Sequence, residues 1–393
     1  MTVHAEEATT AEAERLLDGY HPGCFFFSSP SGTVLGTGVR STFTGAPDEL
    51  VSRVPKLIAD SGGDLVIGAL PFDPAADPRI VVPETLRHAP PLGAVRGLGM
   101  LAVSSTGPVP GRCQVHAVPE PARHMDAVAT AVTALESGEL RKVVLARSLR
   151  VSAPAAINTR HALRNLASRD PNGHIFAMDL GRGVNGPYRT LIGASPELLV
   201  RKAGPFVVSK PVAGSAARSA DPAEDERRGA ALLSSAKDLW EHKVVIESMA
   251  DVLAPYCAEL TVPEPTLVGT EAVWHLGTHI SGRLADPDTS SVELASALHP
   301  TPAICGWPVA EARAAIDDLE PFDRGFYAGT VGWSDANGDG EWAVTLRCGE
   351  VDEDELTLFA GGGIVLGSRP ADELAETSAK FRTLLSAIGI DEA

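Results

Sequence analysis

The sequence lacks the features that mark membrane proteins, nucleic-acid-binding proteins and secreted proteins. It has no run of 18 or more apolar residues, so no membrane-spanning helix is predicted. It has no block of basic residues, and its net charge of -18 repels nucleic acid and anionic lipid. Residues 1–14 have neither the cationic start nor the apolar stretch of a secretory signal. We therefore expect a cytoplasmic protein. We also expect a monomer whose partner is a small-molecule substrate.

Cysteine is also scarce. Five residues are far apart in the chain, their number is odd, and none forms a Cys-x-x-Cys pair. This spacing argues against a disulfide framework or a zinc site. We expect free thiols at Cys24, Cys113, Cys257, Cys305 and Cys348.

The order of the predicted elements indicates an α+β fold. Residues 1–115 are rich in short apolar runs separated by glycine, serine and proline, which predicts a β-rich N-terminal region packed on a catalytic core. Residues 116–393 form the predicted catalytic domain; the alternative is one continuous domain that includes the first region. There, strand pairs and late helices occur without regular strand-helix alternation, which disfavours a doubly wound sheet.

Two glycine-rich segments imitate ligand-binding motifs. Residues 181–186 fit G-x-G-x-x-G, but Pro187 and a second strand follow where a dinucleotide site needs a helix. Residues 335–340 open like a calcium loop, yet Leu346 occupies the position of the required bidentate carboxylate. We predict a hairpin loop for the first segment and a turn between strands for the second.

Two predicted helices each carry a pair of carboxylates three residues apart. Glu373 and Glu376 share a helix face with Lys380, and Asp238 and Glu241 share a face of another helix. Such pairs are common on solvated surfaces. They are also a source of the oxygen ligands that Mg²⁺ prefers.

Eight ordered motifs resemble those of the chorismate-utilising enzymes. The resemblance runs from about residue 118 to residue 380, and isochorismate synthases of the siderophore or menaquinone type are the most similar group. The motifs are 141–147 (RKVVLAR), 193–198 (GASPEL), 211–215 (PVAGS), 237–242 (KDLWEH), 299–303 (HPTPA), 325–333 (GFYAGTVGW), 347–348 (RC) and 360–365 (AGGGIV).

The resemblance implies a fold similar to anthranilate synthase component I, with two β-sheets enclosed by helices around a deep polar site. It also implies one Mg²⁺, held by Glu241 and Glu376, with Asp238 and Glu373 binding its waters. This agrees with the paired carboxylates on the two helices. The cation would bind the ring carboxylate of chorismate and draw electron density from the ring.

The same resemblance implies which residues transfer protons. Lys142 opens an apolar strand and is expected to take a proton from water, because burial favours a neutral amine. Glu197 is expected to protonate the departing hydroxyl, which requires a neutral, buried carboxyl. The alternatives are an ordinary lysine at a strand end and an ordinary glutamate at a strand edge.

Arg347, in an otherwise apolar strand, is expected to bind the enolpyruvyl carboxylate, with a structural salt bridge as the alternative. The run Gly361, Gly362 and Gly363 is expected to offer backbone N–H groups to a carboxylate; the alternative is a tight turn. By resemblance, the remaining predicted substrate-binding residues are Gly214, Ser215, His275, Ala303, Ile304, Tyr327 and Lys380.

Three functions remain open from the sequence. Ala213 stands where the enzymes that make aminodeoxychorismate carry a nucleophilic lysine, so water is the expected nucleophile. The pair Ala303 and Ile304 is similar to that of synthases that stop at isochorismate. This favours an isochorismate synthase, an isomerase, over a salicylate synthase that goes on to expel pyruvate. A non-catalytic chorismate-binding protein is disfavoured, because Lys142 and Glu197 are both present.

Overall fold

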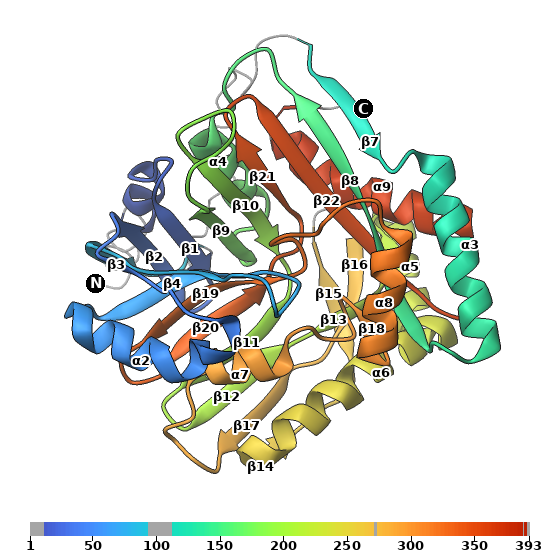
Figure 1. Cartoon of the computed structure of the whole chain (residues 1–393). Coiled ribbons are helices and arrows are strands. Elements are labelled where there is room, and N and C mark those ends of the chain that lie inside the picture. Colours follow the sequence, from blue (N-terminus) through green and yellow to red (C-terminus); the bar gives the residue numbers. More distant parts are fainter. Residues whose placement is uncertain (1–11, 93–111, 271–272, 388, 391–393) are drawn as a thin grey trace.

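The computed structural model describes residues 12–92, 112–270, 273–387 and 389–390. Over these residues the chain forms three antiparallel sheets surrounded by helices (Figure 1). The α+β prediction is confirmed. Besides the two predicted sheets, there is a third, of three strands, which the sequence did not indicate.

The largest sheet has ten strands. Its order is β18-β8-β22-β21-β10-β9-β1-β2-β6, and β7 pairs with β8. The strands are β1 (Phe25–Ser29), β2 (Gly32–Thr37), β6 (Thr85–Ala89), β7 (Gln114–Val118), β8 (Lys142–Ser152), β9 (His174–Asp179), β10 (Arg189–Ser195), β18 (Gly306–Trp307), β21 (Cys348–Asp352) and β22 (Glu355–Ile364). The loop between β9 and β10 contains residues 181–186, so the predicted hairpin is confirmed.

The second sheet has nine strands in the order β14-β17-β12-β11-β20-β19-β4-β5-β3. They are β3 (Ser41–Thr42), β4 (Leu65–Leu70), β5 (Arg79–Val82), β11 (Leu198–Ala203), β12 (Phe206–Lys210), β14 (Cys257–Thr261), β17 (Ile280–Leu284), β19 (Thr330–Asp335) and β20 (Gly340–Val344). Residues 335–340 make the turn between β19 and β20, as predicted. The third sheet, β13-β16-β15, consists of β13 (Val212–Ala217), β15 (Thr266–Gly269) and β16 (Val273–Gly277).

Helices cover the outer surfaces of the sheets. They are a helix over residues 12–18, α2 (Leu50–Ser61), α3 (Pro121–Ser137), α4 (Thr159–Arg169), α5 (Pro222–Ser234), α6 (Ala236–Leu253), α7 (Ser291–Leu298), α8 (Val309–Leu319) and α9 (Pro370–Ala387), with short 3-10 turns η1 (Pro47–Glu49) and η4 (Ala254–Tyr256). Local sequence sets several of their starts. Asp221 and Ser235 cap α5 and α6, each accepting a hydrogen bond from a backbone N–H three residues on.

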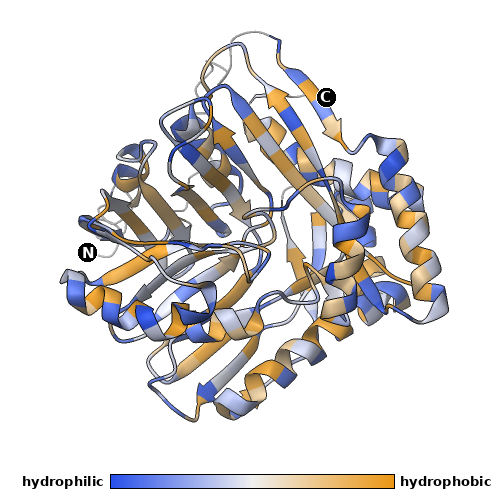
Figure 2. Ribbon diagram, viewed as in Figure 1, coloured by the Kyte–Doolittle hydropathy of each residue, from blue (hydrophilic) through white to orange (hydrophobic). Residues whose placement is uncertain are grey.

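Strands from the N-terminal part of the chain belong to both large sheets. β1 pairs with β9, and β4 pairs with β19. Orange, hydrophobic segments dominate the strands in Figure 2, whereas α2 and α3 alternate blue and orange around their circumference. The predicted boundary near residue 115 stays a prediction, and residues 93–111 before it lie outside the described residues.

All five cysteines are free thiols, as predicted. Of the helices in the described part of the chain, none combines the length and apolar character needed to cross a membrane.

Candidate active site

A pocket of about 650 Å³, counting the part open to solvent, lies where the ten-stranded and three-stranded sheets meet α6 and α9. Most of the predicted site residues line it. They are Glu197, Gly214, Ser215, Glu241, His275, Ala303, Ile304, Tyr327, Arg347, Gly361, Gly363, Glu376 and Lys380. The other four, Lys142, Asp238, Gly362 and Glu373, contact these residues from behind. The structure thus brings every predicted site residue to one place.

Lys142 is the first residue of β8 and is completely buried. Its Nζ lies 3.0 Å from Oε1 of Glu241, yet it makes no hydrogen bond of ordinary geometry with any described residue. Lys142 is therefore a buried amine whose close carboxylate neighbour is Glu241. The alternative of an ordinary, solvated lysine at a strand end does not fit this burial.

Glu197 lies in the turn between β10 and β11 and is 1% exposed. Burial raises the pKa of its carboxyl to about 8, although the nearby charges of Lys142 and Arg347 act in the opposite direction. Neither carboxyl oxygen closes a hydrogen bond of ordinary geometry with the described residues. At neutral pH this side chain therefore holds a proton that it can donate.

Four carboxylates converge from α6 and α9. Burial raises the pKa of Asp238, and the neighbouring Glu241 and Glu376 raise it further. Burial likewise raises the pKa of Glu373, with Glu376 adding to the effect. These side chains therefore repel one another electrostatically and are only partly compensated.

Three lysines compensate the acidic cluster. Lys142 faces Glu241, Lys237 lies 3.2 Å from Glu373, and Lys380 lies 2.6 Å from Oε1 of Glu376. Burial raises the pKa of Glu376, but Lys380 and the hydroxyl of Ser215 outweigh it, so the net shift is downward. Oε2 of Glu373 is buried without a hydrogen-bond partner among the described residues.

The donor set of this cluster is all oxygen, which suits a hard divalent cation. In the described part of the chain, however, no three acidic, histidine or cysteine side chains are already grouped as metal ligands. Instead, one oxygen each of Glu241, Glu373 and Glu376 lies close to a lysine amine.

Arg347 requires one correction. The sequence predicted that it lies within a strand, but β20 ends at Val344 and β21 begins at Cys348, so Arg347 occupies the turn between them with φ of +47°. This left-handed conformation is unusual for a side chain other than glycine, asparagine or aspartate, and it aims the buried guanidinium into the pocket.

His275 fixes one edge of that guanidinium. Arg347 Nη2 donates to Nε2 of His275 at 2.9 Å, and Nδ1 of His275 donates to the carbonyl of Gly214 at 3.3 Å. Burial, followed by the charges of Arg347 and Lys380, lowers the pKa of His275, so the ring is neutral. His275 therefore orients Arg347 without competing for an anion.

The glycine run lies in β22, opposite residues 144–146 of β8. A Cβ at Gly363 would lie 2.2 Å from Oε1 of Glu241, and one at Gly361 would lie 2.8 Å from the Tyr327 hydroxyl. Lys380 donates to the carbonyl of Gly361, which therefore points away from β8. Since the N–H and C=O of a strand residue share a side, the N–H groups of Gly361 and Gly363 face the pocket. The run is part of a strand and not a tight turn.

An apolar wall faces these polar groups. It includes Ala303 and Ile304, together with Tyr327, whose ring stacks on Phe359 with centroids 5.0 Å apart. The sequence prediction missed Phe359, although it directly precedes the AGGGIV motif. It also missed Lys237, which opens the KDLWEH motif.

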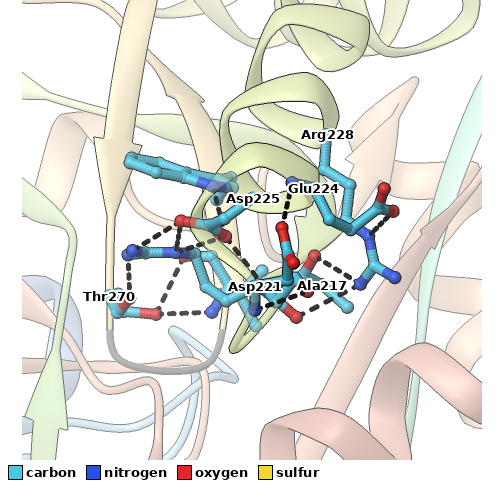
Figure 3. Close-up of polar contacts among 10 residues, drawn as sticks. Ala217, Asp221, Glu224, Asp225, Arg228 and Thr270 are labelled. Carbon is cyan, nitrogen blue, oxygen red and sulfur yellow. Dashed lines mark hydrogen bonds and ion pairs between the residues drawn. The ribbon is translucent and has the colours of Figure 1, made fainter.

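A second polar cluster supports the strand that carries Gly214 and Ser215 (Figure 3). Arg218, just beyond the end of β13, forms two hydrogen bonds to Asp225 of α5 and one to the carbonyl of Thr270. Its guanidinium lies 4.0 Å from the centroid of the Trp274 ring. These contacts fasten β13 to α5 and to β16.

The pocket joins two cationic side chains, backbone N–H groups, a buried acid and a cluster of carboxylates, and this arrangement is suited to an enzyme that acts on an anionic small molecule. The chain belongs to the chorismate binding enzyme family, whose pattern matches residues 103–389. The family predicted from the eight motifs is therefore confirmed.

The chain is similar to named isochorismate synthases over nearly its whole length. It is 47% identical to isochorismate synthase DhbC of Bacillus subtilis (strain 168), over 98% of both chains. The structure of DhbC from Bacillus anthracis matches it with a TM-score of 0.90 and 44% identity, covering 96% of this chain and 100% of that one.

A more distant structure shares the fold. Anthranilate synthase component I from Streptococcus pneumoniae TIGR4 matches with a TM-score of 0.68 and 22% identity, over 93% of this chain and 90% of that one. The predicted fold class is confirmed by this likeness.

Proposed function

We propose that this protein is an isochorismate synthase that converts chorismate to isochorismate. The observation that carries the proposal is the burial of a lysine and a protonated glutamate around one pocket. Lys142 is completely buried, and burial raises the pKa of Glu197 to about 8. A base and an acid in one site are what the exchange of a ring hydroxyl requires.

The proposed step is balanced in atoms and charge. Neutral Lys142 accepts a proton from a water molecule, whose oxygen bonds to one ring carbon. The double bonds shift, the bond from another ring carbon to its hydroxyl breaks, and the proton of Glu197 makes the leaving group water. Proton return from Lys142 to Glu197 through solvent restores both residues. One water molecule enters and one leaves, so the reaction is an isomerisation.

The two substrate carboxylates match two sets of donors. Arg347, oriented by His275, is suited to the enolpyruvyl carboxylate because a guanidinium binds a planar anion with two parallel hydrogen bonds. The pocket-facing N–H groups of Gly361 and Gly363 are suited to the ring carboxylate, and Lys380 lies beside them. These donors allow a dianion to bind despite the net charge of -18.

We further propose that Mg²⁺ is the cofactor, held by Glu241 and Glu376 with Asp238 and Glu373 around its waters. Burial and neighbouring carboxylates raise the pKa values of Asp238 and Glu373, and one oxygen of Glu373 has no hydrogen-bond partner among the described residues. Both observations support the proposal, because a cation compensates such a cluster. When bound, Mg²⁺ supplies Lewis-acid polarisation of the ring carboxylate. Glu241, which would be one of the residues holding the ion, lies 3.0 Å from Nζ of Lys142.

The test is an assay of purified protein with chorismate and Mg²⁺, with products separated by chromatography. We expect isochorismate alone, and no product after metal removal by chelation, with activity restored by added Mg²⁺. Salicylate with pyruvate would instead indicate a salicylate synthase. Unchanged chorismate, with binding detected by calorimetry, would indicate a non-catalytic binding protein.

A further inference from the structure

Strand β8, which carries Lys142, has an incomplete outer edge. On one side β22 pairs with residues 143–152 of β8. On the other side, among the described strands, β18 pairs only with Lys142 and Val143, and β7 pairs only from Ser148 onward. The intervening backbone groups need other partners, because a buried unpaired peptide group is costly.

Two side chains that follow α8 complete this edge. The carboxylate of Glu320 accepts a hydrogen bond from the backbone N–H of Ala146 at 2.7 Å. Arg324 donates to the carbonyl of Val144 at 2.7 Å and to the carbonyl of Ile304 at 2.8 Å. One guanidinium therefore joins the strand of the proposed base to the apolar wall of the pocket.

The two side chains also bind each other. Nε and Nη2 of Arg324 lie 2.9 Å and 2.6 Å from the two carboxylate oxygens of Glu320. Both side chains are at most 3% exposed, and the guanidinium lies 4.4 Å from the centroid of the Phe72 ring. A bidentate pair buried in this way has a single geometry, which a lysine or an amide could not reproduce.

We propose that Glu320 and Arg324 are positioning residues that fix the distance between the Lys142 strand and the Ile304 wall. This inference rests on the proposed function, because it takes Lys142 as the base. Neither Glu320 nor Arg324 lines the pocket. Loss of the pair should therefore lower kcat more than it weakens substrate binding.

The experiment compares Arg324→Lys and Glu320→Gln with the unmodified chain, at a temperature well below the unfolding of each protein. A small displacement of the base costs a large factor in rate, so we expect Arg324→Lys to lower kcat by about 10²-fold, with KM changed by less than about threefold. Glu320→Gln keeps one oxygen acceptor and should lower kcat by about tenfold. It also provides the test if Arg324→Lys does not fold.

Lys202→Met is the matched control. Lys202 is buried, lies 2.9 Å from Asp339 and donates to the carbonyl of Asn337, but it is not a pocket residue. Its loss should lower Tm and leave kcat and KM unchanged. If the variants of Arg324 and Glu320 lower Tm as Lys202→Met does but leave kcat unchanged, the inference about this pair is wrong. The proposed function would not be affected by that result. An unmodified protein that leaves chorismate unchanged would instead overturn the proposed function.

Discussion

Two clusters of buried charge lie beside the same pocket, and they differ in how fully their atoms are paired. In the pair of Glu320 and Arg324, both carboxylate oxygens are hydrogen-bonded, and the guanidinium also binds two carbonyls. In the pocket, the buried atoms without a hydrogen-bond partner among the described residues include Nζ of Lys142, both carboxyl oxygens of Glu197 and one oxygen of Glu373.

The difference separates structural from reactive charge. A fully paired ionic group has no donor or acceptor free to bind a ligand. Its hydrogen bonds hold backbone segments together. A buried polar group without hydrogen-bond partners destabilises the fold. Such groups are found mainly at sites where the function requires them. Measurements of both Tm and kcat should therefore distinguish substitutions in one cluster from substitutions in the other.

The largest effect is expected for Lys142→Ala. Loss of a general base lowers rates by about 10²–10⁴-fold, while the substrate carboxylate sites remain. We expect kcat to fall by this factor, with binding of chorismate still measurable by calorimetry. The remote Lys202→Met variant should keep its turnover. A near-normal rate for Lys142→Ala would show that the unpaired amine is not the base.

The pH dependence of the rate should identify Glu197. Its pKa is raised to about 8, so the proton that it donates is present below that pH and is lost above it. We expect kcat to fall about tenfold for each pH unit well above 8. Glu197→Gln cannot donate a proton, so its residual rate should lack this alkaline decline.

Glu350→Gln serves as the control for that profile. Burial also raises the pKa of Glu350, but this residue does not line the pocket. Its variant should keep the decline of the unmodified protein. An alkaline decline that persists in Glu197→Gln would assign it to another group.

The smallest effect is expected for Ser215→Ala. The Ser215 hydroxyl donates to Oε1 of Glu376 at 2.7 Å, so it orients a proposed metal ligand without contacting the ion itself. Loss of such a partner weakens metal binding by about 10–100-fold. We expect the Mg²⁺ concentration for half-maximal activity to rise, with kcat at saturating Mg²⁺ unchanged. A lower kcat at saturation would place Ser215 in contact with the substrate.

The parts of the fold with strong local signals could be predicted from sequence. The helix around Lys237 to Leu253 is α6, and the strand from Lys142 is β8. Helices α2, α4 and α7 were missed. Helix α2 was missed because the N-terminal third was interpreted as β-rich. Strand order and the third sheet depend on pairings between distant residues, which periodicity does not report.

The residues of the candidate site could be predicted because they belong to short motifs. The contacts between their side chains could not be predicted. The sequence placed Glu241 and Glu376 together, yet nothing local indicates that Lys142 faces Glu241. The strand expected at Arg347 was wrong because the turn there depends on a left-handed residue that is rare outside glycine. The Arg324 network also escaped prediction, because its acceptors are backbone carbonyls far away in the chain.

The pairing of β1 with β9 and of β4 with β19 has a consequence for how the chain is made. During synthesis, β1 and β4 leave the ribosome before the strands with which they pair have been made. Until then their apolar side chains and the hydrogen-bonding groups of their edges are exposed. Strand β19, which pairs with β4, lies near the C-terminal end of the chain. The nine-stranded sheet therefore cannot be completed until β19 has been synthesised, and we expect the nascent chain to be prone to self-association until then.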